Sequence, residues 1–175
     1  MIELQPFTEK DFNTFKSWIH NEEQLFQFAG TIFSYPVTNE QLSIYIKTKD
    51  KKPYKVVLKS TNETIGHCEL NCENQNHRLS RILIGQKEMR GKKIGEQIVR
   101  KMVSLFFLDN QVNEVDLNVF EWNKEAIKCY KKVGFQINTN NTIMVTVNDQ
   151  QWPLLNMSLK RKHITTAKIP ERLGA

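Results

Sequence analysis

The chain opens with alternating apolar and polar residues, and this pattern changes several times along its 175 residues. Residues 2–7 alternate with the two-residue period of a strand, which Pro6 and Thr8 end. Thr8 and Thr38 each stand where an N-cap belongs, with apolar residues at helical spacing after them. This part is predicted to hold one strand and two helices, separated by an irregular, aromatic-rich stretch at 25–35.

Three strand patterns follow, at residues 54–59, 64–72 and 77–85, and polar turns separate them. The Lys-Lys-Pro segment at 51–53 is predicted to form a turn that precedes the first of them. The remaining predicted elements are a helix at 94–108, a strand at 114–120, a short helix from Asn123 to Gly134 and a closing strand pair at 142–147 and 152–159.

The order of these elements predicts one α+β (mixed α/β) domain over residues 1–160, followed by a basic C-terminal tail at 161–175. About seven strands should form a largely antiparallel, twisted sheet with about four helices. Because a helix connects strand 77–85 to strand 114–120, these two strands are expected to run parallel.

The composition is that of a globular protein, with 39% hydrophobic residues and a net charge of +6. This charge favours anionic partners, either a nucleic acid or a polyphosphate cofactor. Nucleic acid is the less favoured of the two, because no long basic run with interleaved aromatics precedes the C-terminus. Neither a signal peptide nor an apolar span is visible, so we expect a cytoplasmic protein without a membrane partner, as a monomer or homodimer.

Three cysteines cannot all pair with one another. This number favours free thiols in the cytosol. Cys68 and Cys72, with His67 beside them, could suggest a metal site. However, alternation along a strand puts both cysteines on one face, and no second ligand pair follows. They are therefore predicted to be core residues, and no metal is expected.

The loop Arg90-Gly91-Lys92-Lys93-Ile94-Gly95 connects the predicted strand 77–85 to the strongly periodic helix 94–108. The amides of such a loop and of the helix N-terminus can point at one anion, which the helix dipole also favours. The loop lacks the Gly-Lys-Ser/Thr of a Walker A motif and the glycine spacing of a Rossmann fingerprint. By itself it is equally explained as an ordinary strand-to-helix turn with a solvated basic face.

The loop resembles the acetyl-CoA loop of the GNAT N-acetyltransferases, Arg/Gln-x-x-Gly/Ala-x-Gly/Ala. Arg90 and Gly95 fit the first and last positions, whereas Lys93 stands where a small residue is usual. The stretch 119–135 is similar to a second GNAT motif, in which Asn opens a helix, Ala-Ile follows, and Tyr precedes a Lys-x-Gly-Phe ending. The N-terminal layout is most similar to the branch that contains ribosomal-protein alanine and spermidine acetyltransferases.

The resemblance implies acetyl-CoA as the cosubstrate. The backbone groups of Ile82, Leu83 and Ile84 would hold the pantetheine arm where two parallel strands splay apart. The amides of Arg90, Gly91, Lys92, Lys93, Ile94 and Gly95 would bind the pyrophosphate. A backbone N–H on the same strand would stabilise the tetrahedral oxyanion.

The resemblance also gives Tyr130 the role of general acid toward the leaving thiolate and makes Asn123 a contact of CoA. From the residues alone, Tyr130 is as well explained as a core aromatic, and Asn123 as a helix N-cap. The acceptor amine needs a base, because it arrives as ammonium at neutral pH. Glu69, on the strand before the cofactor strand, is our candidate base, and His67 on the same face is the alternative.

We therefore expect an acetyl-CoA-dependent N-acetyltransferase that acts by direct attack on a primary amine. This amine could be a protein N-terminus, a polyamine or a small amino compound. A polyamine site would require several carboxylates, for which Glu22, Glu23 and Glu40 are candidates. A non-catalytic CoA-binding module and a basic nucleic-acid-binding protein are the two rival hypotheses.

Overall fold

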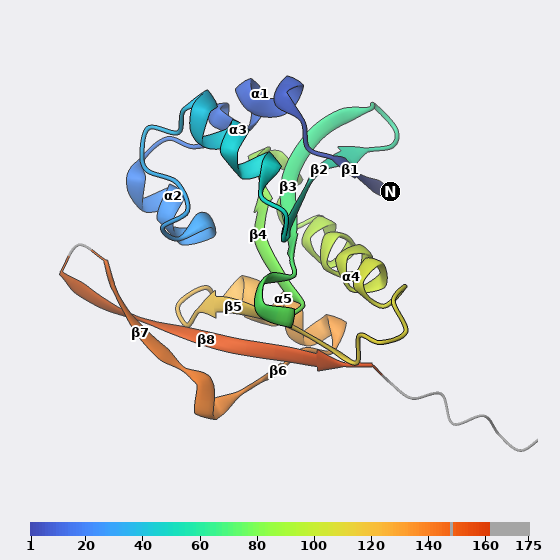
Figure 1. The fold of residues 1–175 in the computed structure, drawn as a ribbon, viewed down its shortest axis with the longest axis vertical. Coiled ribbons are helices and arrows are strands. Elements are labelled where there is room, and N and C mark those ends of the chain that lie inside the picture. Colours follow the sequence, from blue (N-terminus) through green and yellow to red (C-terminus); the bar gives the residue numbers. More distant parts are fainter. Residues whose placement is uncertain (148, 162–175) are drawn as a thin grey trace, which may run out of the picture.

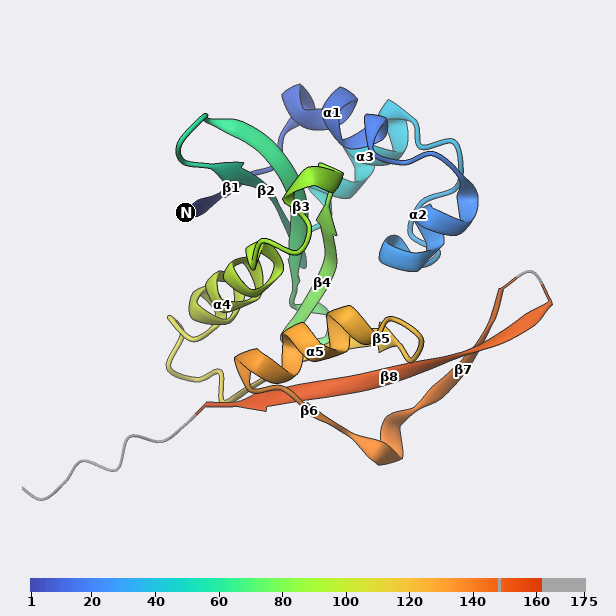
Figure 2. The ribbon, with the colours of Figure 1, turned by 180° about the vertical axis from the view of Figure 1, so that it is seen from behind.

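One sheet runs through the molecule, with helices on both of its faces (Figures 1 and 2). The computed structural model describes residues 1–147 and 149–161. The strands are β1 (Ile2–Pro6), β2 (Lys51–Leu58), β3 (Glu63–Asn71), β4 (Arg78–Ile84), β5 (Glu114–Phe120), β6 (Gln136–Ile137), β7 (Ile143–Val147) and β8 (Gln150–Lys160). The helices are α1 (Phe12–Ser17), α2 (Glu22–Ala29), α3 (Asn39–Lys47), α4 (Ile94–Phe106) and α5 (Lys124–Val133).

The strand order is β1-β2-β3-β4-β5-β8-β6, and β7 pairs with β8. Every pairing is antiparallel except the one between β4 and β5, as the crossover helix predicted. Helices α1–α3 and helix α4 lie on opposite sides of β3 and β4 in both views (Figures 1 and 2). The fold is thus the predicted α+β architecture, with a largely antiparallel sheet.

Alternation along β3 divides the interior into two cores. Cys68 and Leu70 face the larger core, which α4 and α5 cover. His67 and Glu69 are also fully buried, but on the other face, beneath α1–α3. The His67 ring makes edge contacts with Phe7 there, at a centroid distance of 5.0 Å. This second core is mostly aromatic, so the N-terminal helices are held by ring packing rather than by their own length.

Strands β4 and β5 are paired only briefly. Their parallel register holds Arg78 opposite Asp116 and Leu79 opposite Leu117, and no later pair is formed within the described strands. On its other side, β4 stays paired with β3, but the register shifts between His67 and Glu69. The shift places one extra residue in β4, and Arg81 there has a φ of 50°. Strand β4 therefore carries a bulge where it leaves β5.

Several predicted boundaries were wrong. The irregular stretch at 25–35 contains most of α2, which Asn21 caps by accepting from the Gln24 N–H at 2.8 Å. Its aromatic residues hid the helical spacing of the buried Leu25 and Ala29. The predicted turn at 51–53 belongs to β2, since Pro53 pairs with Glu69 near the strand end.

The prediction also missed the two-residue strand β6, so the described residues form eight strands and five α-helices, against about seven and about four predicted. Such short elements form because β8 offers them free ladder groups, which no local sequence pattern records. The caps at Thr38 and Asn123 and the left-handed Gly134 (φ 117°) were predicted correctly. Asn148, in the predicted closing turn, lies outside the described residues.

The two cysteines of the possible metal motif are core residues, as predicted. Cys68 is buried, Cys72 packs against the same core, and His67 points to the opposite face. Most of the predicted C-terminal tail, residues 162–175, lies outside the described residues. Arg161 is fixed, because its guanidinium donates to the carbonyls of Val112 at 2.9 Å and Phe107 at 2.9 Å.

We predict that Phe15→Ala will lower the free energy of unfolding by about 3–5 kcal/mol, measured in urea. Phe15 is fully buried among the rings of the second core, so its removal leaves a cavity beneath α1–α3. Ile44→Ala, on the exposed face of α3, is the control and should change stability by less than about 0.5 kcal/mol. Equal effects of the two substitutions would mean that the aromatic core does not hold these helices.

Candidate active site

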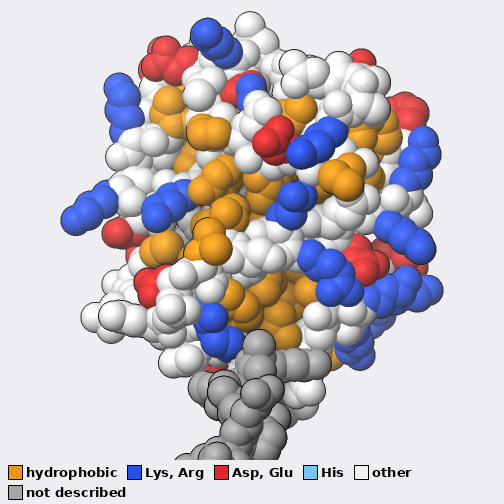
Figure 3. All heavy atoms as spheres, turned by 90° about the vertical axis from the view of Figure 1, so that its right-hand side faces the viewer, with side chains coloured by type: hydrophobic (Ala, Val, Ile, Leu, Met, Phe, Trp, Pro, Cys, Tyr) orange, Lys and Arg blue, Asp and Glu red, His pale blue; other side chains and the backbone are white. Residues whose placement is uncertain are grey.

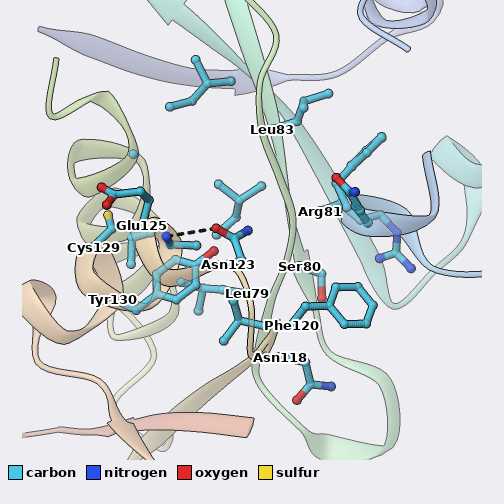
Figure 4. A pocket seen from close by; sticks show the side chains of 18 of the residues that line it. Leu79, Ser80, Arg81, Leu83, Asn118, Phe120, Asn123, Glu125, Cys129 and Tyr130 are labelled. Atoms are coloured by element: carbon cyan, nitrogen blue, oxygen red, sulfur yellow. Dashed lines mark hydrogen bonds between the residues drawn. The ribbon is translucent and has the colours of Figure 1, made fainter. Parts of the chain in front are cut away.

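A cavity of about 960 Å³ opens where β4 leaves β5. Its walls come from β4, the C-terminal end of β5, the loop 90–95, α2 and α5. Figure 4 shows Glu125, Cys129 and Tyr130 on one side of β4, and Arg81 and Phe120 on the other. We call these two sides the α5 half and the α2 half. A molecule lying in the gap between the two strands would reach both halves.

The loop before α4 lines the cavity as an anion site would. Gly91 (φ 75°) and Lys93 (φ 60°) both have left-handed backbones, and Lys93 is the N-cap of α4. The first amides of a helix have no intrahelical acceptor, and those of α4 begin at this loop. Arg90 folds back and donates from Nε and Nη2 to the Ile84 carbonyl, at 3.2 and 3.1 Å.

Five of the six predicted loop residues line the cavity, namely Arg90, Gly91, Lys93, Ile94 and Gly95. Lys92 does not line it. The left-handed turn at Lys93 explains how a long side chain occupies a position where the family motif has a small residue. A Cβ added at Gly95 would lie 3.5 Å from the Cys129 Sγ, so α4 approaches α5 closely at this point.

Ile82, Leu83 and Ile84 line the cavity as predicted. Leu83 pairs with His67 and Ile84 with Gly66 on the β3 side, whereas β5 offers these residues no partner within its described length. The edge of β4 that faces the cavity therefore presents backbone groups without ladder bonds. The Ile84 carbonyl already accepts from Arg90, and an extended ligand could pair with the groups that have no partner.

Asn123 and Tyr130 both lie in the cavity wall, from the start and the middle of α5. The Asn123 Oδ1 accepts from the Ala126 N–H at 3.2 Å, and its amide nitrogen lies on the side toward β4 (Figure 4). Burial raises the pKa of the Tyr130 hydroxyl well above its usual range, so this phenol keeps its proton at neutral pH. One helix thus supplies both residues, because they are seven positions apart and share a face.

Glu69 and His67 are placed differently. Neither lines the cavity; both are fully buried beneath α1–α3. Glu69 forms an ion pair with the Nη1 of Arg81, and burial raises the pKa of its carboxyl against the opposing charge of Arg81. Burial lowers the pKa of His67 to about 4, although its hydrogen bond to the Arg81 carbonyl opposes this. The role of Glu69 as the base stays a prediction.

Sequence reasoning missed Arg78, Arg81 and Phe120 of the α2 half. Two arginines within a strand that otherwise holds four apolar residues and Ser80 were the available signal. The candidate polyamine ligands Glu22, Glu23 and Glu40 are exposed on α2 and α3 and do not line the cavity.

Figure 3 shows how charged side chains are distributed on one face of the molecule. On the face in Figure 3, Lys and Arg side chains are spread out with Asp and Glu between them, without a continuous basic stripe over the described atoms. Among the described residues, no group of three or more His, Cys, Asp or Glu could hold a metal ion. Within 1–147 and 149–161, none of the helices has the length and hydropathy to span a membrane.

The family model for the acetyltransferase (GNAT) domain matches residues 2–136. The chain therefore belongs to the GNAT acetyltransferase family. This confirms the resemblance seen in the loop 90–95 and in the stretch 119–135. The expected enzyme class, a GNAT-type acyl-CoA N-acyltransferase, and the expected cosubstrate, acetyl-CoA, are those of this family.

Solved structures share the fold over nearly the whole chain. An aminoglycoside acetyltransferase AAC(6')-Ib in complex with coenzyme A has a TM-score of 0.72 at 23% identity and covers 92% of this chain and 95% of its own. The spermidine N-acetyltransferase from Vibrio cholerae, in complex with CoA and spermine, has a TM-score of 0.74 at 15% identity, covering 91% and 95%. At such identities the likeness shows the fold alone.

Sequence relatives match over shorter segments. An aminoglycoside N(6')-acetyltransferase type 1 from Klebsiella pneumoniae is 35% identical over 54 residues, which are 31% of this chain and 27% of that protein. The uncharacterized N-acetyltransferase YokL of Bacillus subtilis is 25% identical over 81 residues, 46% of each chain. The match thus spans less than half the length of these relatives.

The pKa of His67 yields a pH prediction. A buried histidine with a pKa of about 4, against 6.5 in the unfolded chain, takes up its proton only after the unfolded chain has done so. The contribution of the neutral His67 to the free energy of unfolding is therefore complete above pH 6.5. It is lost as the pH falls toward 4, and the loss amounts to about 3 kcal/mol. In an NMR titration of the four histidines, the signal that disappears in His67→Gln should titrate near pH 4. A midpoint between pH 6 and 7 would contradict this.

Proposed function

We propose that this chain transfers the acetyl group of acetyl-CoA directly to a primary amine. The observation that carries the proposal is the cavity at the β4–β5 divergence, which is lined by the loop 90–95 and has a protonated phenol in its wall. Family membership supports the same reaction. The pyrophosphate would lie against the amides that precede α4, and the pantetheine arm along β4.

In the reaction, the amine nitrogen attacks the thioester carbonyl carbon and forms the C–N bond. The tetrahedral oxyanion is stabilised by a backbone N–H on the exposed edge of β4. The C–S bond then breaks, and Tyr130 donates its proton to the sulfur, so CoA leaves as a thiol. The amine enters as an ammonium ion and loses one proton before attack, through water to the candidate base Glu69 or to solvent. Its second proton restores Tyr130.

The experiment that tests this function is a screen of amines and N-terminal peptides, with acetyl-CoA and a thiol-detecting reagent. Acceptor-dependent release of free CoA is the expected result. If acetyl-CoA bound but none of the acceptors led to release of CoA, the non-catalytic module would be favoured. If acetyl-CoA did not bind and no CoA was released, the proposal would be rejected.

Tyr130→Phe should lower kcat by about a hundredfold or more, because the thiolate then leaves without a proton donor. The dissociation constant of acetyl-CoA should stay unchanged, because the ring still packs in the α5 half. Tyr35→Phe is the matched control: its exposed hydroxyl donates to the His20 carbonyl, and it does not line the cavity. An unaltered kcat in Tyr130→Phe would remove the phenol from the mechanism.

Arg90→Met should weaken acetyl-CoA binding by about tenfold or more, measured by calorimetry. It removes a charge from the cavity wall together with the contact to the Ile84 carbonyl. Lys92→Met removes the same charge from the same loop but outside the cavity, so a change of less than about threefold is expected. If both substitutions weakened binding equally, the loop would act only through its overall charge.

A further inference from the structure

The charge in the α2 half comes from two arginines of β4. Arg78 and Arg81 line this half, together with Ser80 between them and Phe26 and Phe120 opposite. The bulge explains why Arg81 is there. In an unbroken strand, Arg81 would share the core-facing side of Leu79, but the extra residue in β4 rotates it to the side of Ser80. Figure 4 shows Arg81 across β4 from Tyr130.

The carboxylates next to these arginines turn away from the cavity. Asp116 accepts from the Nε and Nη2 of Arg78 at 2.8 and 2.7 Å, and also from Asn156 at 3.1 Å. Glu69 is fully buried against the Nη1 of Arg81. Neither carboxylate lines the cavity, whereas both arginines do. A molecule in the α2 half therefore meets N–H donors.

The ion pair with Glu69 uses only part of the Arg81 guanidinium. The Nη1 of Arg81 donates to Glu69, whereas the Nε of Arg81 and the Oε2 of Glu69 are buried without a hydrogen-bond partner among the described residues. The buried Nε is out of reach of the cavity, so a ligand carboxylate would bind the part of the Arg81 side chain that lines it. The two acidic residues that line the cavity, Glu96 and Glu125, begin α4 and α5 on the other side of β4. A ligand with further positive charges would thus lose water in the α2 half without a lining carboxylate to replace it.

The remaining wall of the α2 half is apolar. The rings of Phe26 on α2 and Phe120 on β5 lie 6.1 Å apart, and Trp122 stacks on Phe120 at 5.8 Å. These rings pack on one another, so an apolar group on the acceptor would be buried against their cavity side. The half thus combines an anion-binding side and an aromatic side next to the site of acetyl transfer.

We propose that the acceptor is a free apolar amino acid, whose carboxylate binds Arg81 with the help of Arg78 and whose side chain packs against Phe26 and Phe120. This inference rests on the proposed function, since it names the amine of that reaction. Its nitrogen forms the amide bond, the C–S bond breaks, and CoA thiol is released, with one proton passing to solvent.

The test compares acceptors that differ in one charge. CoA release is measured with phenylalanine, leucine and methionine, with their carboxamides, and with spermidine and kanamycin as polycations. The three acids should have a kcat/KM about tenfold or more above that of their amides, because the amides lack the charge that Arg81 binds. Arg81→Met combined with Glu69→Met removes the buried ion pair without leaving a lone charge, and should bring each acid and its amide to equal kcat/KM. The readout is the ratio of acid to amide, so a fall in kcat that both share through the loss of Glu69 does not affect it.

Arg100→Met is the control variant, since Arg100 lies on α4, pairs with Glu96 and does not line the cavity. It should keep the preference for acids. Faster reaction of spermidine or kanamycin, or equal rates for acids and amides in the unaltered protein, would overturn the inference while the proposed function stands. If none of the acceptors led to release of CoA and acetyl-CoA did not bind, both the inference and the proposed function would be contradicted.

Discussion

The separation of β4 from β5 is the constraint on which the rest of the structure depends. Two parallel strands in the middle of a sheet would normally stay paired along their length, because each buried backbone group needs a partner. Here the pairing ends at Leu79 and Leu117. Helix α4, which connects the two strands, and helix α5, which follows β5, cover the larger core below the gap. The sheet remains intact because each strand keeps its other neighbour. Strand β4 stays paired with β3, and β5 pairs with β8 along seven residues.

The bulge in β4 belongs to the same event. It gives Arg81 a left-handed backbone and turns its guanidinium toward the buried Glu69. A buried ion pair is weak evidence for stability, because removing two charges from water costs about as much as their attraction returns. We therefore interpret the Arg81–Glu69 pair as an interaction that orients Arg81 in the cavity wall, and not as a source of stability.

Helix α5 combines structural and chemical roles. Asn123 starts the helix with its side-chain oxygen and presents its amide nitrogen toward β4, and Gly134 ends the helix with a left-handed backbone. Tyr130 packs against the larger core, and its place in the cavity wall follows from the face it shares with Asn123. Neither the structural nor the functional account of these residues excludes the other, since one helix geometry provides both.

The sequence by itself determined the parts of the site that lie close together along the chain. The loop 90–95, the start of α4, and Asn123 with Tyr130 on α5 were all readable, because caps, glycines and helical period act over a few residues. The parallel pairing of β4 and β5 was also readable, because a helix separates the two strands in sequence.

Only the tertiary structure decided where Glu69 and Arg81 lie. A period of two places Glu69 on a face, but it does not tell whether that face meets solvent, a cavity or an aromatic layer. The bulge that redirects Arg81 has no local sequence signal, because it arises from the register between β3 and β4. The α2 half of the cavity is assembled from α2, β4 and β5, and its rings of Phe26 and Phe120 are 94 residues apart in sequence. Long-range packing alone therefore brings its arginines and aromatic rings together.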